Sequence, residues 1–183
     1  MKKKSLALVL ALAMIVVCVV GGTLAWLIAT TGSVTNTFTY GDIDITLAES
    51  ENLDLKMIPG YTIAKDPKVT VLAGSEKCYL FVKVDKSANF DKFMTYDMAA
   101  DWTALTGVNG VFYRVVDTDG MGTAYSVLAN DKVTVRDTVT KDMLNALTAD
   151  TQPTLTFTAY ACQYNSSNNT PFTAEAAWAK VGA

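Results

Sequence analysis

The sequence predicts an all-β fold, a jelly-roll or immunoglobulin-like β-sandwich with one or two short crossover helices. Three observations predict it. Several short segments rich in Val, Thr, Tyr and Phe alternate apolar and polar residues, the period of a half-buried strand. Turn signals separate them: Pro59-Gly60, Ala73-Gly74, Asn109-Gly110 and Asp119-Gly120. Half of the 183 residues are apolar and 18% are charged, which suits a packed core.

Seven segments are predicted to be strands. The first, residues 42–49, places Ile43, Ile45 and Leu47 on one face, and Asp42 and Asp44 on the solvent face. The segments 111–114 and 123–126 flank Asp119-Gly120, so they are predicted to pair as a hairpin. The remaining strands are expected at residues 68–72, 77–85, 111–116, 123–128, 132–136 and 154–164.

Helices are expected to be few and short. Residues 140–148 begin with a capping threonine and carry Met143, Leu144 and Leu147 at helical spacing. Residues 174–180 follow Thr173 and stop before Gly182, and residues 89–94 are predicted to form one further turn.

The first 25 residues have the pattern of a signal peptide. Lys2, Lys3 and Lys4 precede an apolar run, and Thr23 and Ala25 are small where a signal peptidase needs small residues. This pattern predicts cleavage between Ala25 and Trp26. An uncleaved membrane anchor is the alternative, because residues 6–28 are apolar over a length that can span a bilayer.

The charge balance excludes a nucleic-acid-binding protein. The whole chain has 15 basic and 18 acidic residues, and three of the basic ones lie in the predicted leader. A mature chain from residue 26 keeps 12 basic and 18 acidic residues, so it lacks the basic surface that nucleic acid requires.

Catalytic and metal-binding motifs are not found in the sequence. The chain has no histidine, which removes Ser-His-Asp and Cys-His arrangements and His-containing zinc motifs. The segment 117–120 resembles the start of a calcium loop but lacks the third acidic ligand, so a turn is the simpler interpretation. We therefore expect no catalytic residue, metal site or cofactor. Trp102, Trp178 and Tyr113 could line a sugar site, although single aromatic residues near strand ends usually belong to the core or its rim.

Two cysteines remain beyond the leader, Cys78 and Cys162. An exported chain could pair them. However, Cys78 shares the buried face of its strand with Leu80 and Val82, whereas Cys162 is out of phase with the apolar residues of its own strand. Since cysteines on opposite faces rarely meet disulfide geometry, both are expected to be free thiols.

Cleavage would create an unusual new N-terminus. Trp26, Leu27 and Ile28 are apolar where a frayed polar end is the norm. Val34, Phe38 and Tyr40 then share one face of a β-competent segment, opposite three threonines. Residues 26–40 can complete the sheet of their own chain, or they can add to an open sheet edge of the next copy. The second arrangement does not close and produces filaments.

At these residues the chain resembles the TasA/camelysin family of exported Gram-positive matrix proteins. The resemblance lies in GGTLAW, in NTFTYGDIDITLAE (residues 36–49), and in the segments at 65–84 and 132–163. It implies a SipW-type signal peptidase, a jelly-roll-like sandwich, and extracellular fibres that form by donation of the N-terminal strand. Camelysin-like members are also classed as metallopeptidases, but a chain without histidine argues against a zinc mechanism.

Taken together, the sequence predicts a non-enzymatic structural protein of the cell surface or biofilm matrix. The expected organisation is a signal peptide (1–25), a donor strand (26–40) and a sandwich domain (41–183). The expected partners are further copies of the chain, the signal peptidase and a related nucleating protein, with the membrane reached only through an uncleaved leader. A monomeric surface binding module is the alternative, and a secreted metallopeptidase is less favoured.

Overall fold

The computed structural model describes residues 42–50 and 55–182. The chain divides into two units, Met1–Thr39 and Tyr40–Ala183, and every described residue belongs to the second. The predicted cleavage site and donor segment therefore lie outside the described residues. This applies to Ala25, Trp26, Leu27, Ile28, Val34, Phe38 and Tyr40.

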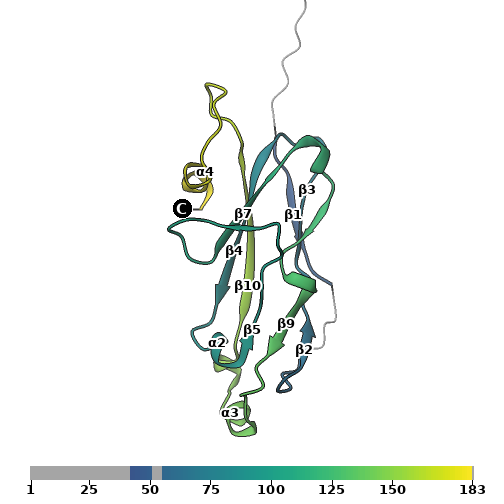
Figure 1. Ribbon diagram of the computed structural model, residues 1–183, viewed down its shortest axis with the longest axis vertical. Helices are drawn as coiled ribbons and strands as arrows, with labels where there is room; N and C mark the ends of the chain where they lie inside the picture. The colour runs from purple at the N-terminus through teal and green to yellow at the C-terminus, as the bar shows by residue number, and fades with distance from the viewer. Residues whose placement is uncertain (1–41, 51–54, 183) are drawn as a thin grey trace, which may run out of the picture. The chain divides into compact units, whose positions relative to one another are not determined.

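The described unit is built from three antiparallel sheets (Figure 1). The four-stranded sheet has the order β10-β4-β7-β6, with β10 at Leu155–Gln163, β4 at Cys78–Lys86, β7 at Val111–Val116 and β6 at Thr103–Ala104. One three-stranded sheet contains β1 (Ile45–Ala48), β3 (Lys68–Val71) and β8 (Ala124–Ser126). The other contains β2 (Thr62–Ala64), β9 (Lys132–Val135) and β5 (Met94–Thr95). The predicted all-β sandwich with short helices is confirmed.

The inner face of the four-stranded sheet forms the main core. Leu80, Val82 and Val84 of β4 pack there against Val69 and Val71 of β3. Leu155 and Phe157 of β10 also contact the cluster around Val133 and Val135 of β9. The two small sheets therefore share one layer, each covering a different part of the large sheet. This burial removes aliphatic surface from water and is the main source of stability.

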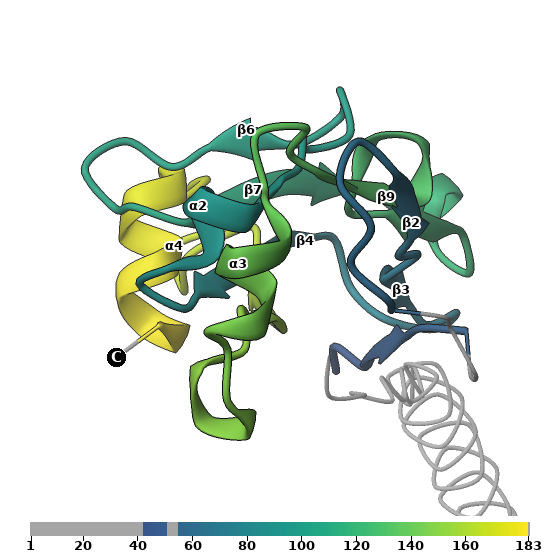
Figure 2. The ribbon, with the colours of Figure 1, turned by 90° about the horizontal axis from the view of Figure 1, so that it is seen from below.

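The outer face of the same sheet is covered by a helix, α4 (Ala174–Val181). Tyr79, Phe81 and Tyr113 lie on this face, and the Phe81 ring is 5.3 Å from that of Trp178 of α4. Figure 2 shows α4 on one side of β4 and β7, with β2, β3 and β9 on the other. Alternation along β4 thus gives its odd-numbered residues an aromatic environment and its even-numbered residues an aliphatic one.

The three predicted helices are present. The side chain of Thr173 accepts a hydrogen bond from the backbone N–H of Ala176 at 3.2 Å and caps α4. Thr140 caps α3 (Lys141–Asn145) in the same way, with 3.3 Å to the N–H of Met143. The turn α2 (Phe90–Phe93) buries both phenylalanines that bound it. Both α2 and α3 lie in connections between the four-stranded sheet and the β2-β9-β5 sheet.

The predicted hairpin of residues 111–114 with 123–126 is wrong. Strand β7 pairs with β4 and β6, whereas β8 pairs with β3 in another sheet. The connection forms a 3₁₀ turn at Thr118–Gly120, which begins at Asp117. Asp117 is held by Lys77 at 2.5 Å, and the N–H of Gly122 donates to the carbonyl of Val71 at 2.7 Å, which directs the chain onto β3. The turn that begins at Asp117 therefore connects the four-stranded sheet to the β1-β3-β8 sheet.

Candidate functional site

The outer edge of β10 is the most unusual feature of the described chain. This strand is nine residues long and lies at the end of its sheet, so one side of its backbone has no partner strand among the described residues. Its sequence, LTFTAYACQ, contains no charged residue and no proline. Exposed edges normally carry lysine or proline, or are short, because an unprotected edge pairs with other chains.

The hydrogen bonds at the two ends of β10 fix which backbone groups face outward. The N–H of Ser87 donates to the carbonyl of Thr154 at 3.0 Å, and the N–H of Tyr164 donates to the carbonyl of Lys77 at 3.0 Å. In an antiparallel ladder these bonded pairs recur at every second residue. The even-numbered residues of β10 therefore bond β4. The odd-numbered ones direct their N–H and C=O groups to the open side, namely Leu155, Phe157, Ala159, Ala161 and Gln163.

A second open edge, that of β1, lies against β10. Strand β1 pairs only with β3 among the described strands, and the carbonyl of Asp44 accepts from the N–H of Leu72 at 2.8 Å. The same alternation directs the backbone of Ile45 and Leu47 away from β3. The two edges come from different sheets and contact each other. We call the strip between them, residues 43–47 and 155–163, the seam.

Grooves follow the seam at both ends. One of about 260 Å³ is lined by Leu47 and Ala48 of β1 and by Leu155 and Phe157 of β10. Another of about 410 Å³ lies between Ile43 and the segment from Gln163 to Ser167. Since Ile43 lies near Gln163 and Leu47 near Leu155, β1 and β10 run in opposite directions. Leu47, predicted to share a face with Ile43 and Ile45, is 39% exposed because it lies at this open edge.

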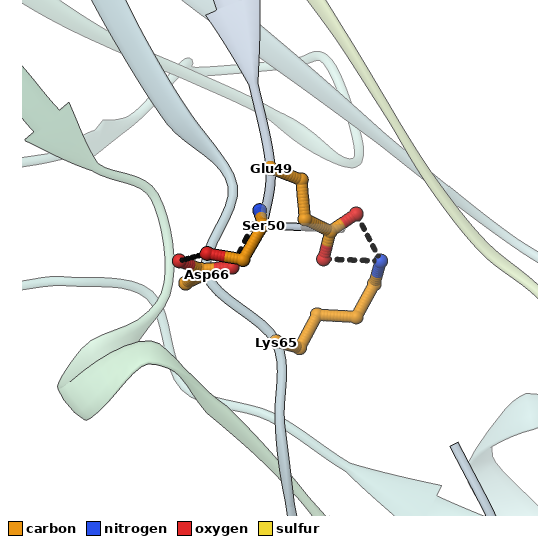
Figure 3. Close-up of polar contacts among 4 residues, drawn as sticks. All are labelled: Glu49, Ser50, Lys65 and Asp66. Atoms are coloured by element: carbon orange, nitrogen blue, oxygen red, sulfur yellow. Dashed lines mark hydrogen bonds and ion pairs between the residues drawn. The ribbon is translucent and has the colours of Figure 1, made fainter. Parts of the chain in front are cut away.

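Polar contacts fasten the chain just beyond β1 (Figure 3). The carboxylate of Glu49 pairs with Lys65 Nζ at 2.7 and 2.8 Å. The hydroxyl of Ser50 donates to Asp66 Oδ2 at 2.6 Å, and its N–H donates to Oδ1 at 3.0 Å. These hydrogen bonds from Ser50 lower the pKa of the Asp66 carboxyl. They attach the end of β1 to the segment between β2 and β3 and so fix one wall of the seam.

The aromatic residues considered for a sugar site do not come together. Trp102 is buried in the inner core, where its indole N–H donates to the carbonyl of Ser126 at 2.9 Å. Tyr113 and Trp178 lie in the outer cluster, on the opposite face of the same sheet. The suggested site of these three residues is therefore wrong, because the four-stranded sheet lies between Trp102 and the other two.

The predicted separation of the cysteines is confirmed. Cys78 is completely buried in the inner core, and Cys162 is 8% exposed in the outer cluster. Both are free thiols. Burial raises the pKa of the Cys78 thiol to about 11, and burial also raises that of Cys162. Neither has the lowered pKa of a reactive thiol.

Metal-binding clusters and membrane-spanning helices are absent from the described part of the chain. Within residues 42–50 and 55–182, no group of three or more Cys, Asp or Glu side chains is placed to hold a metal ion. None of the helices in those residues is long and apolar enough to cross a membrane.

Comparison with protein-family models, with curated proteins and with solved structures gave no significant match. The resemblance to the TasA/camelysin family therefore remains an expectation from the sequence.

The sequence pattern predicts a tail that would donate a strand but does not predict the edge that would receive it. One signal was present: residues 151–164 contain no charge, although the segment is long for a strand. Whether such a strand lies at the centre or the edge of a sheet depends on sheet order, which a single sequence does not reveal.

Proposed function

We propose that the chain is an exported structural protein that assembles into fibres at the cell surface or in the extracellular matrix. Residues 26–40 of one copy add as a strand to the next copy. The outer edge of β10 receives it. The protein acts as a scaffold rather than as an enzyme, and its principal partner is another copy of itself.

The observation that carries this proposal is the uncharged, nine-residue open edge of β10. Five residues of this edge direct outward N–H and C=O groups that no described strand pairs, and a strand added there would satisfy them. The other outer strands of the sheets are two to four residues long. An edge as long and uncharged as that of β10 favours aggregation unless it is paired in the working protein.

The leader and the tail supply the second half of the proposal. A signal peptide cut after Ala25 would free the β-competent segment only once the chain is outside the cell. Assembly would then be tied to export, with a SipW-type peptidase as the processing enzyme and a related matrix protein as nucleator.

The test uses purified protein that begins at Trp26, kept at high concentration and viewed by negative-stain electron microscopy. We expect filaments with a regular axial repeat. Ala159→Pro should prevent them, because Ala159 directs its N–H to the open side and proline removes that donor without breaking the β10–β4 ladder. Circular dichroism and urea unfolding should show that the sandwich remains folded.

Two further variants make the result specific. Ala124→Pro places proline on the exposed edge of β8, so it should leave the filaments intact. Deletion of residues 26–40 should abolish assembly without unfolding the domain. If Ala159→Pro forms the same filaments as the parent protein, β10 is not the acceptor strand. If the parent protein stays monomeric under all conditions, the proposed fibre is refuted.

A further inference from the structure

The tail and the edge strand carry the same three-residue sequence. Thr37-Phe38-Thr39 lies in the predicted donor segment, and Thr156-Phe157-Thr158 lies in β10. We infer that residues 33–40 of one copy pair antiparallel with β10 of another copy, with Phe38 directly opposite Phe157. This inference rests on the proposed function and specifies the direction and register of the donated strand.

The connection of the tail to β1 determines whether the tail can run parallel or antiparallel to β10. The described chain begins at Asp42, next to Ile43, at the end of the seam where Gln163 lies. A tail that turned back into its own seam would run opposite to β1 and therefore parallel to β10. A tail from another copy has no such constraint and can run antiparallel to β10. Antiparallel pairing is slightly more stable per residue, so the better pairing is open only to a second copy.

The side chains on the two faces of β10 favour one register. Leu155, Phe157, Ala159 and Ala161 lie on the inner face and contact the core, while Thr156 and Thr158 lie on the other face. With Phe38 opposite Phe157, the tail directs its threonines to the same face as those of β10. Thr39 then meets Thr156, and Thr37 meets Thr158.

The hydrogen-bond phase of β10 agrees with this register. Because Phe157 directs its N–H and C=O groups outward, the two phenylalanines would form a hydrogen-bonded pair. The threonines would then form non-hydrogen-bonded pairs, in which the side chains approach most closely. Cross-strand aromatic and Thr–Thr pairs are among those that stabilise sheets.

Shifting the tail by two residues is less favourable in both directions. One shift forms three Thr–Thr pairs, but it places polar Asn36 opposite Phe157 and Tyr40 opposite Pro153, which has no N–H to donate. The other places Thr37 opposite Tyr160 and leaves a single Thr–Thr pair. In the inferred register Tyr40 lies opposite Leu155, Val34 opposite Ala161, and Asn36 opposite Ala159, whose methyl group leaves it room.

Disulfide cross-linking tests the register. The protein from Trp26 with Thr37→Cys and Thr158→Cys is assembled and then mildly oxidised, on a Cys162→Ser background because Cys162 would lie opposite Ser33. Non-hydrogen-bonded pairs place their Cα atoms about 4.5 Å apart, within the range of a disulfide. We expect the monomer band to be lost to a covalent ladder on a non-reducing gel.

The controls carry the shifted pairs, Thr37→Cys with Thr156→Cys and Thr39→Cys with Thr158→Cys. Neither should yield a ladder. Filaments that cross-link only in a control pair would overturn the register and leave the proposed fibre standing. A cross-linked monomer in dilute solution would overturn donation to a second copy. Loss of filaments in the parent chain itself would remove the proposed function and this inference together.

Discussion

On its inner face the four-stranded sheet packs Leu80 and Val82 against the β1-β3-β8 sheet, whereas on its outer face it packs Tyr79 and Phe81 against one helix. The buried residues of the inner core are aliphatic apart from Cys78 and Trp102, and they come from strands distant in sequence. The outer cluster is aromatic, and its cover is a single eight-residue helix that depends on a threonine cap. Strand β4 therefore contributes to two cores. The inner core forms only when several distant strands have assembled, whereas the outer cluster requires the single helix α4.

The largest effect is expected from Phe81→Ala. Phe81 is completely buried and contacts Tyr79, Tyr113 and Trp178 through its ring. Its truncation should lower the free energy of unfolding by about 3–5 kcal/mol, as measured by urea denaturation. Val82→Ala, the adjacent residue on the inner face, removes less volume and should cost less. A larger loss from Val82→Ala would mean that the aromatic cluster contributes little as a core.

A second prediction contrasts the two cysteines at alkaline pH. The Cys78 thiol has its pKa raised to about 11 by burial, so it stays neutral in the folded state after it ionises in the unfolded chain. The unfolded state then binds fewer protons, and stability should fall as the pH rises from 9 to 11. The loss from this group should be roughly 2–3 kcal/mol.

Chemical denaturation at several pH values, with Cys78→Ala beside the parent, isolates the contribution of this thiol. The variant should show a smaller decline above pH 9. Cys162→Ala is the matched control, and it should retain most of the decline. An equal slope for the parent and Cys78→Ala would contradict the neutral buried thiol.

The smallest effect is expected from the cap of α4. Thr173→Ala removes the side-chain acceptor for the N–H of Ala176 and should cost about 1 kcal/mol. Hydrogen exchange should accelerate in α4 while the β10–β4 amides stay protected. Thr140→Ala makes the same change at α3 and should leave exchange in α4 unchanged. If hydrogen exchange in Thr173→Ala accelerates equally over the whole domain, α4 does not unfold independently of the sheet.

Local patterns in the sequence predicted much of the fold. The alternation in residues 77–85 and 154–164 identified β4 and β10, and Thr140 and Thr173 identified the starts of α3 and α4. Strands β2, β5 and β6 were not predicted, because two or three residues carry no measurable period. The false hairpin of β7 with β8 has a similar cause, since a turn sequence shows that the chain bends but not which strand it meets next.

The candidate site was predictable only in part. The phase of β10 follows from its sequence, and so does the opposite placement of Cys78 and Cys162. The open edge depends on β10 being last in its sheet, which is decided by long-range pairing. The exposure of Leu47 has the same origin: an apolar side chain in phase with the core stays accessible when no strand lies beside it.

The contacts that hold the end of β1 have a consequence for a domain pulled by its tail, as it would be in the proposed fibre. Tension on the preceding tail enters the described chain at Asp42. The bonds between β1 and β3 lie perpendicular to the strands, so a force along β1 strains them together in shear and does not open them one at a time. The contacts of Glu49 with Lys65 and of Ser50 with Asp66 lie beyond the far end of β1. If the proposed fibre is stretched, we expect them to yield only after the whole strand has begun to slide.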